Sequence, residues 1–106
     1  MEYRDLKYWL SDNIDPLELV KEHGAPLYVY DSSIIERQYN RLINAFNVKE
    51  LKINYACKAL SNISILRFFR SMGSGLDCVS IQEVQLGLRA GFAPQDIIFT
   101  DRKSVV

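Results

Sequence analysis

The chain has 106 residues, 13 of them basic and 13 acidic, and 48% of its residues are apolar. Its length suits one domain or less, and its balanced charge offers no basic surface for a nucleic acid or an anionic membrane. Its apolar stretches are too short to cross a bilayer, and its first residues lack the apolar region of a secretory signal, so we expect a cytoplasmic protein.

The first predicted element is a short helix that begins after Asp15. Asp15 can act as the N-cap, Pro16 suits the first helical position, and Gly24 supplies the left-handed residue that ends a helix. The lone histidine, His23, lies at the end of this helix, where a positive charge interacts favourably with the helix dipole. A surface cap therefore explains His23 better than catalysis does.

A strand and a longer helix are predicted next. Residues 27–30 are rich in β-forming side chains and follow Pro26, which predicts a short strand. The segment from Ser33 to Glu36 matches a capping box. Apolar residues follow it at helical spacing, so we expect a helix to about Phe46.

From Leu51 onward the sequence alternates between apolar runs and helical patterns, with a period of about twenty-two residues. This rhythm is typical of parallel strands joined by helical crossovers. The expected strands lie near residues 51–57, 76–79 and 96–100, and the expected helices near 62–72 and 81–90.

Ser80 and Glu83 form a capping box at the start of the last predicted helix, and Gly91 supplies its stop. Capping is a sufficient explanation for both polar residues. The helical spacing places three apolar side chains of this helix on its inward face: Ile81, Val84 and Leu88.

Cys57 and Cys78 lie in predicted neighbouring strands. A free cysteine in such a place behaves as a small apolar residue, so we expect both thiols to be reduced and unreactive. With His23 they match no recognised metal-ligand spacing, and we expect no metal site.

Lys58 directly follows the predicted strand 51–57 and therefore lies at its carboxyl end, where α/β folds gather their catalytic groups. An amine held against apolar neighbours is harder to protonate than an amine in water, so it can attack an aldehyde. This reasoning points to a lysine that forms a Schiff base. The alternative is an ordinary solvated loop residue.

Asp77 interrupts the apolar strand 76–79, where a carboxylate is costly unless it is paired or functional. The alternative is that Asp77 lies at the mouth of the strand and bonds to the backbone. Gly73 and Gly75 precede this strand rather than follow one, so they do not form a dinucleotide-binding turn.

Two motifs at their mutual spacing resemble the start of a fold-type III pyridoxal-phosphate-dependent decarboxylase. Residues 25–31 and the helix after them most resemble the diaminopimelate decarboxylases. Ornithine, arginine and carboxynorspermidine decarboxylases remain alternatives, and alanine racemase is more distant. The resemblance covers roughly residues 25–100. The motifs are Tyr55-Ala56-Cys57-Lys58-Ala59 and Gly73-Ser74-Gly75-Leu76-Asp77-Cys78-Val79-Ser80-Ile81-Gln82-Glu83.

The resemblance implies a role for four residues. Lys58 corresponds to the lysine that holds pyridoxal 5′-phosphate, and Ala56 to a small residue beside the cofactor. Asp77 corresponds to an acid near the bond between lysine and cofactor, and Glu83 to an acid a little further away. The chain departs from the family at Leu60, where asparagine is usual.

The resemblance also implies an α/β fold, the first part of a pyridoxal-phosphate-binding (β/α)8 barrel of the alanine racemase type, truncated after about three strands. Residues 1–31 would pair with the second, β domain of the family, and residues 32–106 would form the partial barrel. The implied reaction is the decarboxylation of meso-diaminopimelate to L-lysine by a homodimer. We expect the short chain alone to be inactive and to aggregate or bind a chaperone, because a sheet edge and apolar faces stay uncovered.

Two alternatives stay open. One is a decarboxylase or racemase of the same fold that acts on another amino acid, since the residues that select the substrate lie mostly beyond Val106. The other is a non-catalytic module, either pyridoxal-phosphate-carrying or flavodoxin-like, which would be complete within about 106 to 150 residues. The absence of a closing helix and of phosphate-binding loops weighs against such a module.

Overall fold

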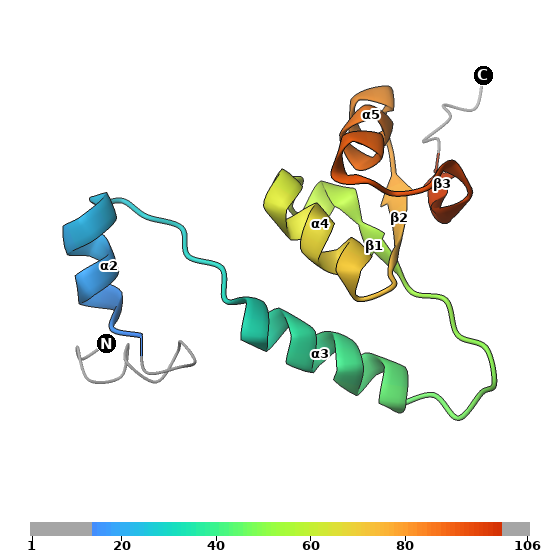
Figure 1. Ribbon diagram of the computed structural model, residues 1–106, viewed down its shortest axis with the longest axis horizontal. Coiled ribbons are helices and arrows are strands. Elements are labelled where there is room, and N and C mark those ends of the chain that lie inside the picture. The colour runs from blue at the N-terminus through green and yellow to red at the C-terminus, as the bar shows by residue number, and fades with distance from the viewer. Residues whose placement is uncertain (1–13, 101–106) are drawn as a thin grey trace, which may run out of the picture. The chain divides into compact units, whose positions relative to one another are not determined.

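The computed structural model describes residues 14–100 and divides the chain into two compact units, Met1–Ala45 and Phe46–Val106 (Figure 1). The predicted domain boundary between residues 31 and 32 concerns the domains of the complete family enzyme, and it stays a prediction. None of the helices in the described part of the chain has the length and apolar character needed to cross a membrane.

The first unit contains helix α2 (Pro16–His23), as predicted from its caps. The carboxylate of Asp15 accepts a hydrogen bond from the backbone N–H of Leu17 at 3.0 Å, which satisfies one of the unpaired donors at the start of the helix. Gly24 ends the helix with a φ of 86°, a backbone conformation that costs glycine little.

Helix α3 (Ser32–Asn44) begins earlier and ends earlier than predicted. Its N-cap is Asp31, whose carboxylate accepts a hydrogen bond from the N–H of Ser33 at 3.0 Å. The capping-box assignment to Ser33 was therefore wrong by two residues, because an aspartate closer to the preceding extended segment supplies the cap.

The predicted strand over residues 27–30 is also wrong. These residues belong to no strand, and the side chain of Tyr28 is 86% exposed. A strand exists only through hydrogen bonds to a neighbouring strand, and no partner occurs among residues 14–45. The high β-propensity of this segment is therefore not sufficient to form a strand here.

The second unit is an α/β structure with three parallel strands in the order β1-β2-β3 (Figure 1). The predicted rhythm of strands and helices is confirmed, although the first and third strands are shorter than predicted and the second begins and ends one residue earlier. The strands are β1 (Asn54–Ala56), β2 (Gly75–Cys78) and β3 (Ile97–Phe99); the helices are α4 (Ile63–Ser71) and α5 (Ile81–Ala90), with short 3-10 helices η1 (Cys57–Ala59) and η2 (Pro94–Asp96).

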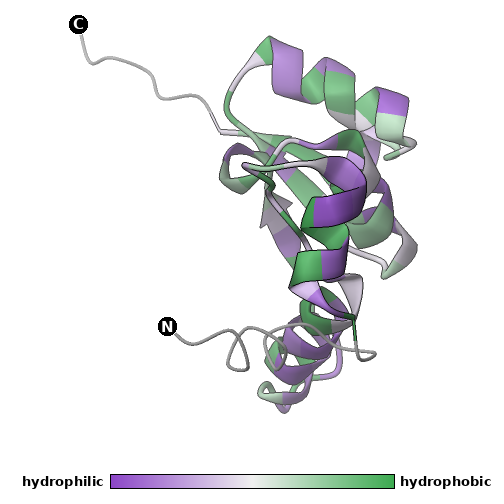
Figure 2. Cartoon of the chain, turned by 90° about the vertical axis from the view of Figure 1, so that its left-hand side faces the viewer, coloured by the Kyte–Doolittle hydropathy of each residue, from purple (hydrophilic) through white to green (hydrophobic). Residues whose placement is uncertain are grey.

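The core of the second unit lies between the sheet and the two helices. Hydrophobic and hydrophilic residues are interspersed along the helices in Figure 2. Both helices supply residues to this core, among them Leu66 of α4 and Ala90 of α5. The opposite face of the sheet has no helix over it among residues 46–100. The buried core residues are Cys57, Leu66, Leu76, Cys78, Ala90 and Phe92.

The side of helix α5 that contacts the sheet matches the predicted side only in part. Ile81 and Leu88 are 59% and 47% exposed, so their predicted inward position is wrong, whereas Val84 packs against the core. Gly87 and Ala90 are buried instead. A side chain at position 87 would meet the Cδ2 atom of Leu76 at 2.5 Å, so the glycine allows the helix to approach the sheet closely.

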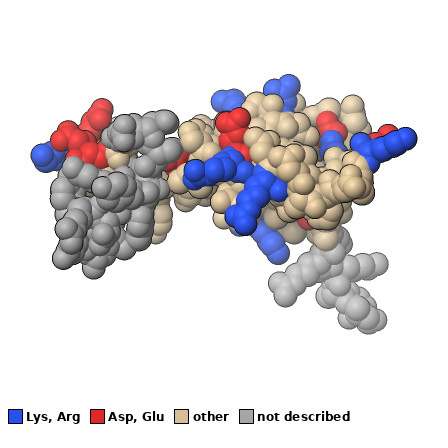
Figure 3. Space-filling view, turned by 90° about the horizontal axis from the view of Figure 1, so that it is seen from below, with Lys and Arg blue, Asp and Glu red and all other residues tan. Residues whose placement is uncertain are grey.

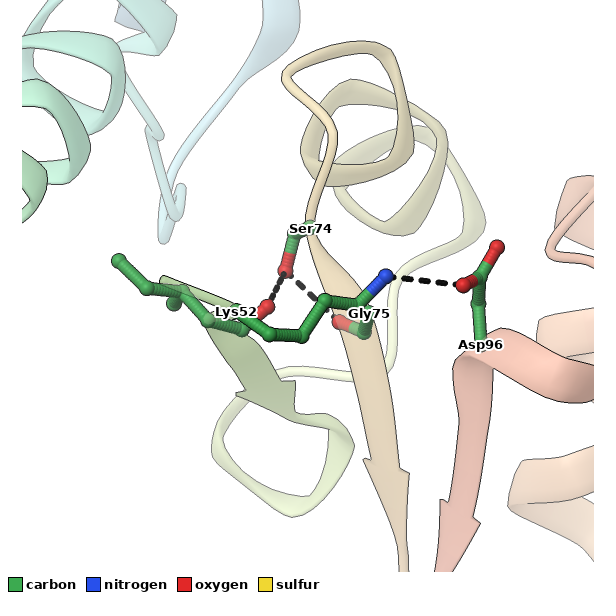
Figure 4. Close-up of polar contacts among 5 residues, drawn as sticks. Lys52, Ser74, Gly75 and Asp96 are labelled. Atoms are coloured by element: carbon green, nitrogen blue, oxygen red, sulfur yellow. Dashed lines mark hydrogen bonds and ion pairs between the residues drawn. The ribbon is translucent and has the colours of Figure 1, made fainter. Parts of the chain in front are cut away.

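The amino end of the sheet is held by a contact that crosses the middle strand (Figure 4). The ammonium group of Lys52 lies 2.8 Å from the Oδ1 atom of Asp96, and the two residues come from opposite sides of Gly75. Beside them, the Ser74 hydroxyl lies within hydrogen-bonding distance of the carbonyl oxygens of Ile53 and Gly75, at 3.2 and 2.7 Å. These contacts align the three strands before they reach their carboxyl ends.

Charged side chains of both signs occur on the surface shown in Figure 3, in keeping with the equal numbers of acidic and basic residues. The ion pair of Lys52 with Asp96 is exposed, with about half of the lysine side chain in contact with solvent. We therefore expect the ion pair to contribute less to the free energy of unfolding than the close packing around Gly75 does.

We predict that Gly75→Ala lowers the free energy of unfolding by about 1–3 kcal/mol, the usual cost of overpacking a well-packed site. A methyl group at this position would contact the side-chain oxygen of Asn54 and lie 2.9 Å from the backbone oxygen of Asp96. Urea unfolding followed by circular dichroism measures the change.

The matched control is Lys52→Met, which keeps the aliphatic stem and removes the charge. It should cost less than about 1 kcal/mol, because the ion pair is exposed. Equal midpoints for Gly75→Ala and the unchanged chain would show that the strands do not pack as closely as described.

Candidate active site

The register of the sheet brings the predicted site residues of β1 and β2 together. Ala56 pairs with Asp77, and Asp77 pairs with Ile98 on the third strand. Side chains paired across parallel strands point to the same face, and successive residues alternate between faces. Because Leu76 and Cys78 face the core, Ala56 and Asp77 lie side by side on the uncovered face, near the carboxyl ends of their strands.

Lys58 lies in the 3-10 turn η1, directly after β1, and its neighbours anchor this turn. Cys57 is completely buried in the core. The hydroxyl of Tyr55 donates a hydrogen bond to the carbonyl oxygen of Leu60 at 2.9 Å, and its ring stacks on Phe69 with centroids 4.0 Å apart. The turn that carries Lys58 is therefore fixed on both sides of the lysine.

The side chain of Lys58 is exposed. The apolar surroundings that the sequence predicted for its amine are not provided by residues 14–100, because the sheet face beside it has no cover. No hydrogen bond or ion pair of this ammonium group occurs within the same residues. The amine is thus accessible to a ligand, while both a catalytic role and a solvated loop residue remain compatible with its position.

Asp77 is half-buried and accepts a hydrogen bond from the hydroxyl of Thr100, with an Oγ1 to Oδ1 distance of 2.7 Å. The backbone partner considered as an alternative explanation for Asp77 is not found in the described residues. Sequence reasoning missed Thr100. Its polar side chain at the end of the third predicted strand was the available signal, but its contact with Asp77 depends on the register of β3.

Glu83 takes part in a capping box, as its spacing from Ser80 predicted. Its carboxylate accepts a hydrogen bond from the N–H of Val79 at 2.9 Å, and the Ser80 hydroxyl accepts one from the N–H of Glu83 at 3.2 Å. These bonds fix the start of α5 immediately after β2. The structure therefore confirms capping, and a contact of Glu83 with a cofactor stays a prediction.

Cys57 and Cys78 are free and completely buried, as predicted. Burial raises the pKa of the Cys57 thiol, with a further contribution from the negative charge of Glu83. Burial, followed by the neighbouring Cys57, raises the pKa of Cys78 to about 11. No cluster of residues able to hold a metal ion occurs in the part of the chain that the structure describes.

Comparisons with known proteins agree on one family. The family described as "Pyridoxal-dependent decarboxylase, pyridoxal binding domain" matches residues 32–105. The diaminopimelate decarboxylase of Methanothermobacter thermautotrophicus is 39% identical over 102 residues, which cover 94% of this chain and 24% of that protein. The chain therefore spans about a quarter of the length of this curated relative.

Solved structures show the same relationship. The diaminopimelate decarboxylase of M. jannaschii in complex with L-lysine superposes with a TM-score of 0.79 and 34% identity, covering 85% of this chain and 22% of that one. The lysine/ornithine decarboxylase of Vibrio vulnificus in complex with cadaverine has a TM-score of 0.77 and 28% identity, covering 90% of this chain and 26% of that one.

We predict that iodoacetamide alkylates Cys57 and Cys78 slowly at pH 9 in the folded chain and rapidly in urea. Both folded pKa values are raised, so the thiols stay protonated, whereas the ordinary value is 9.0. The folded state holds both protons more tightly than the unfolded chain does; the contribution of Cys78 to stability is complete below pH 9 and is lost as the pH rises through its folded pKa of about 11. Mass spectrometry of quenched samples measures alkylation, and equal rates with and without urea would contradict burial of the pair.

Proposed function

Because this chain belongs to the pyridoxal-dependent decarboxylases, through its match to their pyridoxal binding domain, we propose that its site serves the decarboxylation of meso-diaminopimelate to L-lysine. The observation that carries the proposal is the placement of the Lys58 amine and the Asp77 carboxylate at the carboxyl edge of one parallel sheet. In α/β barrels this edge is where the chemistry takes place.

The residues present fit the reactive end of pyridoxal phosphate. Lys58 offers an exposed amine, and an amine is the group with which the aldehyde of pyridoxal phosphate forms a Schiff base. Ala56 leaves room on the uncovered face beside Asp77, since its side chain is a single methyl group. A planar ring could therefore lie against this face without displacing a large side chain.

The bound cofactor would supply an electron sink for the electrons released when carbon dioxide leaves. Lys58 would hold the cofactor in place before the substrate amine arrives. The carboxylate of Asp77 would favour the protonated state of a nitrogen next to it, since an opposite charge nearby stabilises the charged form. Glu83, engaged with the N–H of Val79, would act by holding the start of α5 in place beside the site.

The finer architecture is part of the same proposal. Residues 32–106 would form the first three β/α units of a (β/α)8 barrel, and residues 1–31 would contact the second domain. The complete enzyme would be a cytoplasmic homodimer. The chain by itself would be inactive, because one sheet face and the outer edges of β1 and β3 have no partner in residues 46–100.

A second candidate is a decarboxylase of the same fold that acts on ornithine or a related amino acid. The similarity to the V. vulnificus lysine/ornithine decarboxylase favours keeping this candidate. Its identity of 28%, against 34% for the M. jannaschii diaminopimelate decarboxylase, ranks it second. The family match across residues 32–105 weighs against the alternative of a non-catalytic interaction module.

We predict that this chain can replace the aligned N-terminal segment of the M. thermautotrophicus enzyme. The hybrid should restore growth without lysine to a bacterium that lacks diaminopimelate decarboxylase. Lys58→Ala should abolish this growth, whereas Lys52→Ala, just before the amino end of β1, should preserve it. Asp77→Asn should lower the turnover number of the purified hybrid by about 100-fold, within the range of acid–base effects.

A parallel hybrid with the V. vulnificus enzyme tests the second candidate. Ornithine decarboxylation in that hybrid, together with failure of the diaminopimelate hybrid, would reverse the ranking. Full activity of the Lys58→Ala hybrid would overturn the assignment of the cofactor lysine.

A further inference from the structure

The hydrogen bond between Thr100 and Asp77 adds the third strand to the site. We propose that Thr100 is a positioning residue that fixes the carboxylate of Asp77 for the reaction at Lys58; this inference rests on the proposed function. The observation is the 2.7 Å contact between the Thr100 hydroxyl and one carboxylate oxygen. Thr100 lies outside the two motifs that end at Ala59 and Glu83.

The backbone around Thr100 explains why its side chain reaches Asp77. The N–H of Thr100 donates to the carbonyl oxygen of Cys78 at 2.8 Å, which continues the pairing of β2 and β3 by one residue. Ile98 is the register partner of Asp77, and Thr100 follows it by two residues, so both side chains lie on the uncovered face. The hydroxyl therefore meets the carboxylate diagonally across two strands.

The contact involves only one of the two carboxylate oxygens of Asp77. Thr100 holds the Oδ1 atom, and the carboxylate of Asp77 accepts no second hydrogen bond among residues 14–100. The other oxygen remains available on the face that Ala56 shares. A carboxylate held by one oxygen has fewer rotamers to lose when its other oxygen engages a cofactor or substrate, and preorganisation of this kind favours binding and reaction.

A purely structural role for the hydroxyl is the competing explanation. The backbone bond from Thr100 to Cys78 already extends the sheet, and it does not require a hydroxyl. Thr100 is exposed, so its side chain adds little to the core. Valine would serve a structural role at least as well as serine, because β-branched residues favour strands. The two substitutions therefore separate the explanations.

The test compares Thr100→Val and Thr100→Ser with the unchanged full chain. The first readout is the side-chain rotamer of Asp77, from NMR couplings in the isotopically labelled chain. The second is the rate at which pyridoxal phosphate and borohydride label Lys58, measured from pH 6 to pH 9. We expect valine to average the Asp77 rotamers and to slow labelling about two- to tenfold, the equivalent of one hydrogen bond. Serine should preserve a single rotamer and the parental rate.

Each outcome decides the proposal. Averaged rotamers with valine and one rotamer with serine support it, and equal rotamers in both variants overturn it. If the unchanged chain shows no selective labelling of Lys58, the three strands alone do not make this amine selective; the hybrid enzyme then tests the proposed function, and the rotamer comparison still decides the role of Thr100. Unchanged backbone amide shifts in β3 establish that both variants retain the fold.

Discussion

The parallel register of three short strands is the constraint on which the rest of this structure depends. Pairing Ala56 with Asp77, and Asp77 with Ile98, assigns every second residue to the core and every other one to the open face. A slip of one residue would turn Asp77 into the core and expose Leu76. The same register that builds the core therefore also builds the candidate site.

Contacts at the two ends of the sheet serve different purposes. At the amino end, Lys52 and Asp96 meet across Gly75, which aligns the strands. At the carboxyl end, a turn, a strand and a loop each contribute one functional group: Lys58, Asp77 and Thr100. The stable end of the sheet thus supports an edge whose polar groups remain open to a ligand, as expected for α/β enzymes.

The sequence predicted the local features of this chain well because their causes are local. Asp15 and Gly24 bound α2, and Ser80 and Glu83 begin α5, through contacts within a few residues. The alternation of apolar runs and helical patterns from Leu51 onward also predicted the parallel strands. Features that depend on distant partners were missed or wrong: residues 27–30 lack the neighbour that a strand requires, and the contact of Thr100 follows from register alone. The open surroundings of Lys58 likewise reflect an uncovered sheet face that local sequence does not reveal.

The central claim is that Lys58, carried by the turn after β1 at the carboxyl end of the sheet, is the lysine that binds pyridoxal phosphate. Treating the chain with pyridoxal phosphate, reducing with borohydride and mapping the labelled peptides tests it directly, with Lys49 as an exposed lysine for comparison and Lys58→Ala as the control. Our account predicts that the label concentrates on Lys58 and that the variant loses it without gain elsewhere. Equal labelling of Lys49 and Lys58 would contradict a site built by these three strands.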